Sequence, residues 1–96
     1  MINAILIDDE PAARVTLALE IQLHCPQIRI IAEAGSVAEG IEVLRLHPHA
    51  QLLFLDIQLT DGSGFDLLQN IDFQNLKIIF TTAYSEYALR AIKFSP

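Results

Sequence analysis

The chain has 96 residues, a formal net charge of −6 and a hydrophobic content of 52%, which together predict one compact acidic domain spanning residues 1–96. Its longest apolar runs, such as residues 52–55, are far shorter than the roughly 20 residues that a bilayer requires. The sequence therefore excludes a transmembrane helix. Six scattered lysine and arginine residues form no basic patch, so we expect no direct contact with nucleic acid. A single cysteine and an N-terminus without a signal-peptide pattern favour the cytoplasm.

The first half of the chain alternates short apolar runs with stretches of helical periodicity, which is typical of βα units around a buried parallel sheet. Residues 4–7 are predicted as the first strand, residues 11–24 as a helix and residues 28–32 as the second strand. Proline at the first turn marks the start of this helix, and Pro26 marks its end. Its core-facing stripe is expected at Ala12, Val15, Leu19 and Leu23.

The second half continues the same alternation. Ser36 and Glu39 have the spacing of a capping box, which begins a helix that ends near Leu46. Residues 52–55 are apolar on both faces, as in a central strand, and are followed by Asp56. A turn at residues 61–64, a short helix through Ile71, a strand at residues 76–81 and a helix from near Tyr84 complete an α/β architecture of four strands and four helices.

Acidic residues follow two of the predicted strands. Asp8 and Asp9 come after the first strand, and Asp56 comes after the third. Ligands of open α/β sheets bind at the carboxyl ends of the strands, and right-handed crossovers place these two strands side by side if the second βα unit lies on the outer flank. Carboxylates so close together repel one another unless a cation binds them, and an all-oxygen site suits Mg²⁺ or Mn²⁺. The sequence therefore predicts a divalent metal site, although acids at such positions also serve as helix caps.

A metal beside Asp56 would allow its carboxylate to attack a phosphoryl donor, so Asp56 is a candidate phosphoacceptor. Thr82 follows the fourth predicted strand, and its hydroxyl could donate a hydrogen bond to a bound phosphoryl oxygen.

Three motifs make the whole chain similar to the receiver domains of bacterial two-component response regulators. They are residues 5–10 (ILIDDE), residues 53–59 (LFLDIQL) followed by Gly64, and residues 79–84 (IFTTAY). The resemblance implies a three-layer α/β/α, flavodoxin-like (CheY-like) doubly wound parallel sheet with strand order 2-1-3-4-(5). Residues 80–89 further resemble regulators that carry a LytTR-type DNA-binding domain downstream.

The resemblance also implies a role for each matching residue. Asp56 corresponds to the phosphorylated aspartate, Asp9 to a direct metal ligand and Asp8 to an acid that holds the metal through water. Gln58 would complete the metal site through its main-chain carbonyl, and Thr82 would be the hydroxyl that follows the phosphoryl group. The implied function is a Mg²⁺-dependent signalling switch, not an enzyme beyond self-catalysed phosphotransfer and dephosphorylation. A sensor histidine kinase would donate the phosphoryl group, and DNA would be met only through a downstream domain.

The sequence departs from the family pattern in two loop positions and at its end. Thr60 stands where many receivers have proline, and Ser63 stands where aspartate is common. No fifth βα unit follows, so the family's lysine is missing and Lys93 lies too early to replace it. We therefore expect a truncated receiver whose fourth strand is an open edge that favours self-association or homodimerisation.

Two alternatives stay open at this stage. One is a receiver-like interaction or dimerisation module that is never phosphorylated, which the missing lysine favours. The other is a phosphatase of the haloacid-dehalogenase type, which also forms an aspartyl phosphate after an apolar strand. That class needs a second acid two residues after the nucleophile, where this chain has Gln58.

Overall fold

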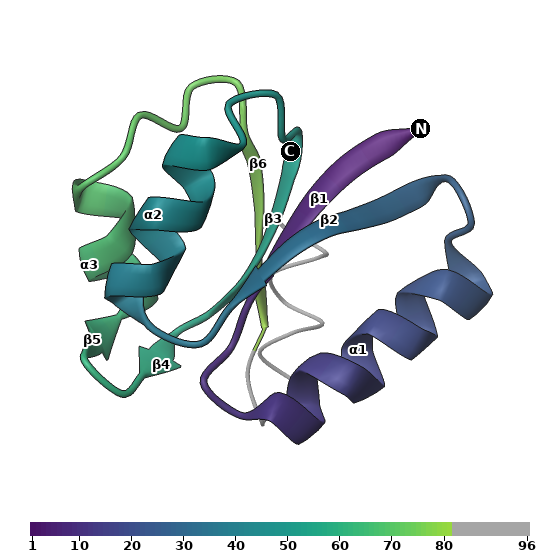
Figure 1. Ribbon diagram of the computed structural model, residues 1–96, viewed down its shortest axis with the longest axis horizontal. Helices are drawn as coiled ribbons and strands as arrows, with labels where there is room; N and C mark the ends of the chain where they lie inside the picture. The colour runs from purple at the N-terminus through teal and green to yellow at the C-terminus, as the bar shows by residue number, and fades with distance from the viewer. Residues whose placement is uncertain (82–96) are drawn as a thin grey trace.

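The computed structural model describes residues 1–81, which form a parallel sheet between helices. The sheet contains β1 (Ile2–Ile7), β2 (Ile28–Ala34), β3 (Leu52–Asp56) and β6 (Lys77–Thr81) in the order β2-β1-β3-β6. Figure 1 shows α2 (Val37–Leu46) and α3 (Gly64–Gln69) on one side of the sheet and α1 (Pro11–His24) on the other. The expected three-layer fold and the order of its first four strands are confirmed. The helix predicted from Tyr84 lies outside the described residues.

The two faces of the sheet form two separate cores, because successive residues of a strand point to opposite faces. Toward α2 and α3, the fully buried side chains are Ile5, Ile7, Leu53, Leu55 and Leu67. Toward α1, the buried residues are Ala4, Leu6, Ile21, Leu52 and Phe54. Both faces of β1 and β3 are therefore buried, as the continuous apolar runs predicted.

The predicted core-facing stripe of α1 is wrong. Val15, Leu19 and Leu23 are 60%, 54% and 75% exposed, and Ala12 is exposed as well. The buried face of α1 is formed instead by Ile21, with Leu17 and Ala18 packed against the same core. The helix carries apolar residues on two sides, so helical periodicity alone fitted either side.

This correction predicts an inverted order of mutational sensitivity on α1. Leu19→Gln, a large chemical change at an exposed position, should alter the free energy of unfolding by less than about 0.5 kcal/mol. Ile21→Val, the loss of one methylene at a buried position, should cost about 1 kcal/mol. Urea denaturation of both variants measures the difference, and a costlier Leu19→Gln would contradict the observed orientation of α1.

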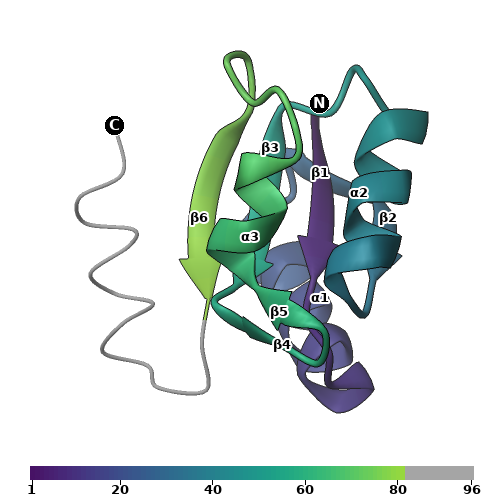
Figure 2. The ribbon, with the colours of Figure 1, turned by 90° about the vertical axis from the view of Figure 1, so that its left-hand side faces the viewer.

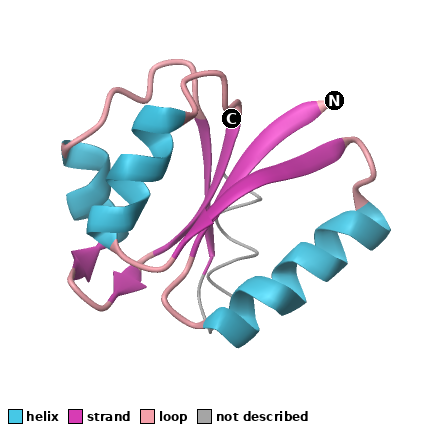
Figure 3. Cartoon of the chain, in the orientation of Figure 1, coloured by secondary structure: helices cyan, strands magenta, loops and turns pink. Residues whose placement is uncertain are grey.

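The boundaries of several elements differ from the predicted ones. β2 runs to Ala34, two residues beyond the predicted 28–32, and α3 ends at Gln69, so Ile71 lies after it. Between β3 and α3 the chain forms a small hairpin that the sequence did not predict, made of β4 (Gln58–Leu59) and β5 (Gly62–Ser63). Figures 2 and 3 show this hairpin, called the β4–β5 hairpin below, at the end of the molecule where β3 runs into β4.

None of the helices within residues 1–81 is long and apolar enough to cross a membrane.

Candidate functional site

The register of the sheet brings the acidic residues together. Ile7 of β1 is paired directly with Leu55 of β3, so the residues that follow them, Asp8 and Asp56, leave the sheet side by side. Asp9 is the next residue after Asp8. One carboxylate oxygen from each of Asp8, Asp9 and Asp56 lies within 4.8 Å of the others. We call these three residues the acidic cluster; the structure brings their carboxylates together, as the sequence-based expectation of a shared site requires.

The acidic cluster is electrostatically strained without a cation. Burial, together with the negative charges of Asp8 and Asp9, raises the pKa of Asp56 to about 6, although the Gln58 N–H donates a hydrogen bond that opposes this rise. Burial also raises the pKa of Asp8, which is only 9% exposed, and the neighbouring Asp9 adds to the effect. Both shifts show that the fold disfavours negative charge at a place where it nevertheless gathers three carboxylates.

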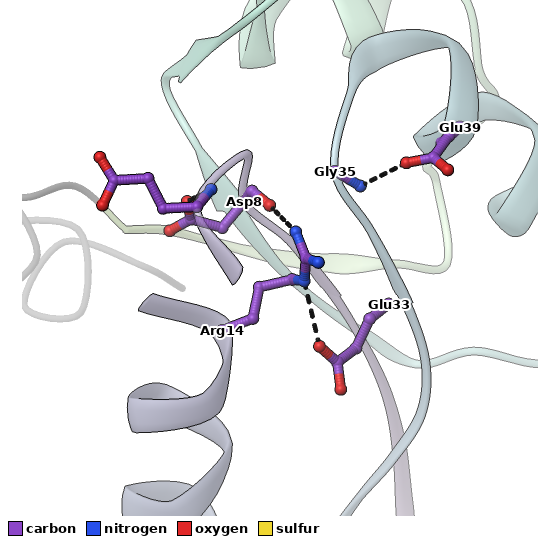
Figure 4. A network of polar contacts seen from close by, with 6 residues as sticks. Asp8, Arg14, Glu33, Gly35 and Glu39 are labelled. Atoms are coloured by element: carbon purple, nitrogen blue, oxygen red, sulfur yellow. Dashed lines mark hydrogen bonds and ion pairs between the residues drawn. The ribbon is translucent and has the colours of Figure 1, made fainter. Parts of the chain in front are cut away.

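A polar network fixes the backbone that carries Asp8 (Figure 4). Arg14 of α1 donates a hydrogen bond to the main-chain carbonyl of Asp8, and its Nε lies 3.2 Å from a carboxylate oxygen of Glu33 in β2. The N–H of Asp8 donates to the carbonyl of Ala34. The turn after β1 is therefore held by both α1 and β2, and the direction of the Asp8 side chain is set by the fold.

Hydrogen bonds also fix the loop after Asp56. The N–H of Gln58 donates to Asp56 Oδ1 at 3.2 Å, and the N–H of Gly64 donates to the carbonyl of Ile57 at 2.8 Å. Ser63, where receivers commonly have aspartate, is the N-cap of α3 and forms a complete capping box with Asp66. This departure from the family pattern therefore has a structural role, because Ser63 caps α3.

Asp61, which the sequence predicted only as part of a turn, makes a contact that its sequence position does not indicate. Asp61, at the tip of the β4–β5 hairpin, accepts hydrogen bonds from the backbone N–H groups of Val37 and Ala38 at 2.7 and 3.1 Å. These residues begin α2, 24 and 23 positions earlier in the chain. No local sequence signal marks such a contact, because the capping acid lies far from the helix that it caps.

The acidic cluster fits a hard divalent cation. All its donors are carboxylate oxygens, which suit Mg²⁺ or Mn²⁺ rather than softer metals, and burial raises the pKa values of Asp8 and Asp56, so a cation there would offset disfavoured negative charge. Gln58 is exposed and lies two residues after Asp56, and its main-chain carbonyl is a further oxygen donor. Thr82, the expected phosphoryl hydroxyl, lies outside the described residues.

A family model matches residues 4–95, and its description is the response regulator receiver domain. The chain belongs to this family. Among curated relatives, the sensory transduction protein LytT of Enterococcus faecalis is 44% identical over 95 residues, covering 95% of this chain and 38% of LytT. LytR of Staphylococcus epidermidis is 39% identical, covering 97% of this chain and 37% of that protein. These relatives agree with the LytTR-type subfamily expected from residues 80–89. The chain spans well under half the length of the curated relatives that it matches.

Solved structures confirm the fold of this receiver. The response regulator domain of Thermotoga maritima CheB aligns with a TM-score of 0.73 at 20% identity, covering 95% of this chain and 72% of that domain. CheY6 from R. sphaeroides, solved in complex with the P1 domain of CheA3, gives a TM-score of 0.74 at 25% identity, covering 96% of this chain and 74% of that one.

Proposed function

We propose that this receiver accepts a phosphoryl group on Asp56 from the phosphohistidine of a sensor histidine kinase and so acts as a phosphorylation-dependent signalling switch. The observation that carries the proposal is the acidic cluster, whose three carboxylates meet where β1 and β3 end. Membership of the receiver family supports the same role. The haloacid-dehalogenase alternative is set aside, because the family match covers nearly the whole chain.

In the proposed step, an oxygen of the Asp56 carboxylate forms a bond to phosphorus while the phosphorus–nitrogen bond of the donor breaks. The electron pair of that bond returns to the imidazole nitrogen of the donor, whose other ring nitrogen carries a proton, so the donor leaves as neutral histidine. The Gln58 N–H holds Asp56 Oδ1, which leaves the other carboxylate oxygen to attack. The product is an aspartyl phosphate, and its hydrolysis resets the switch.

Asp8, Asp9, Asp56 and the main-chain carbonyl of Gln58 would hold Mg²⁺ or Mn²⁺. When bound, such an ion neutralises the clustered carboxylates and the negative charge on the transferring phosphoryl group. Thr82 is proposed to donate its hydroxyl to a phosphoryl oxygen and to report the modified state.

The whole protein's output is also part of the proposal. We infer that phosphorylation controls a DNA-binding domain downstream of this receiver, since relatives such as BtsR of Escherichia coli are named transcriptional regulatory proteins. The receiver would act in the cytoplasm, with no catalysis beyond its own phosphorylation and dephosphorylation. β6 lies at one edge of the described sheet, and self-association through this edge is consistent with a homodimer.

Intact mass spectrometry after incubation with acetyl phosphate tests the proposal. We expect one phosphoryl adduct that requires Mg²⁺ and disappears in Asp56→Asn. Glu20→Gln, which neutralises an exposed carboxylate on α1, is the matched control and should be labelled like the unaltered chain. A folded chain that gains no adduct would instead favour the interaction module that is never phosphorylated.

A further inference from the structure

The tip of the β4–β5 hairpin is attached to the start of α2 by Asp61. Its two carboxylate oxygens accept from different donors, Val37 N–H and Ala38 N–H, at 2.7 and 3.1 Å. These are the first two residues of α2, and their N–H groups have no partner within the helix. Ser36, the N-cap, accepts from the N–H of Glu39 at 3.1 Å. The start of α2 is therefore capped partly by its own N-cap residue and partly by a residue of the distant hairpin.

The Asp61 contact is charge-assisted. A carboxylate at a helix N-terminus is favoured by the helix dipole as well as by the two hydrogen bonds. These backbone hydrogen bonds lower the pKa of Asp61, so that it is ionised at neutral pH. Asp61 is not one of the carboxylates that meet in the acidic cluster. Its carboxylate binds the N-terminus of α2 instead.

The hairpin that Asp61 holds is short and begins directly after Asp56. Gln58 pairs with Ser63 across the hairpin, and Leu59 is buried in the same core as Val37. Gly62 turns the chain just after Asp61 with a φ of +153°, which glycine adopts readily. The hydrogen bond from Gly64 to Ile57 closes the base of the hairpin. The position of Gln58 therefore depends on a base fixed beside Asp56 and a tip fixed to α2.

We propose that Asp61 is a positioning residue for the metal site. By holding the hairpin against α2, it would hold the loop that carries the main-chain carbonyl of Gln58, which is the proposed further oxygen ligand beside the acidic cluster. The proposal rests on the function proposed above, because it assigns Asp61 a role in that site. The same contact would also couple the acidic cluster to the start of α2. Because coupling between two binding equilibria is reciprocal, a cation that binds the acidic cluster should strengthen the hydrogen bonds between Asp61 and α2.

Calorimetric titration of the full chain with Mg²⁺ alone tests this role. Asp61→Ala should weaken Mg²⁺ binding about 3- to 10-fold, the size of effect expected for coupling through a contact outside the ligand set. Ser36→Ala is the matched control, because it removes a cap from the same helix end without touching the hairpin. It should lower thermal stability to a similar degree but change the Mg²⁺ affinity less than about 2-fold.

Hydrogen exchange of the unaltered chain provides a second measurement that does not depend on whether a variant folds. Saturation with Mg²⁺ should slow exchange of the Val37 and Ala38 amides by the same 3- to 10-fold factor as the affinity loss in Asp61→Ala. Equal Mg²⁺ affinity in all three chains, equal losses in both variants, or unchanged exchange would each overturn the positioning role while leaving the metal site intact. If the unaltered chain binds no Mg²⁺, the proposed function itself fails, and the positioning role fails with it.

Discussion

Gly64→Ala is expected to destabilise the chain by about 2–3 kcal/mol and to abolish its response to Mg²⁺. A Cβ at this position would lie 2.6 Å from the main-chain oxygen of Asp56 and 3.0 Å from Cγ of Leu55. A main-chain oxygen within a buried strand cannot rotate away as a side chain can. The clash would therefore displace either α3 or the end of β3, and with it Asp56, the proposed phosphoacceptor.

Urea denaturation with and without Mg²⁺ measures both effects. Leu19→Gln is the control, since Leu19 is exposed on α1 and contacts neither α3 nor the acidic cluster. That substitution should cost less than about 0.5 kcal/mol and leave the Mg²⁺ response in place. A Gly64→Ala chain with unaltered stability would show that α3 does not approach Asp56 as closely as the structure indicates.

The central strands were predictable because parallel strands with both faces buried are continuously apolar, as at residues 52–55, and their order followed from the resemblance to receiver domains. Which face of α1 is buried was not predictable, because Leu19 and Ile21 are both apolar and only packing decides between them. The β4–β5 hairpin was not predicted for a different reason. Each of its strands has two residues, which is too short for any alternation to show.

The acidic cluster was predictable from topology alone. Once β1 and β3 are neighbours in a parallel sheet, the residues that follow them must leave at the same edge, so Asp8 and Asp56 meet. The contact of Asp61 with α2 depends on where the hairpin folds back, which no spacing in the sequence encodes. The proposed metal ligands thus follow from the order of the strands, whereas the residue proposed to position them follows from tertiary packing.

Asp56→Asn is expected to stabilise the metal-free chain by about 1–2 kcal/mol at pH 7.5. The pKa of Asp56 is raised to about 6 in the folded chain from an ordinary value of 3.8, so between these values the folded state binds more protons than the unfolded state. Stability therefore falls as pH rises through this window and stays reduced above it. The full shift corresponds to about 3 kcal/mol, and solvent screening at this partly exposed group lowers it to the expected value.

The pH dependence separates this effect from a general change in packing. At pH 4 the folded form of either chain carries a mostly neutral group at position 56, so most of the gain in stability should be lost there. If Mg²⁺ binds the folded acidic cluster as proposed, it should stabilise the unaltered chain at pH 7.5 and stabilise Asp56→Asn much less. Urea denaturation from pH 4 to 7.5 provides the measurement, and Glu20→Gln should follow the unaltered chain throughout. If the gain in stability of Asp56→Asn over the unaltered chain is no larger at pH 7.5 than at pH 4, the folded protein tolerates the clustered charges without a cation.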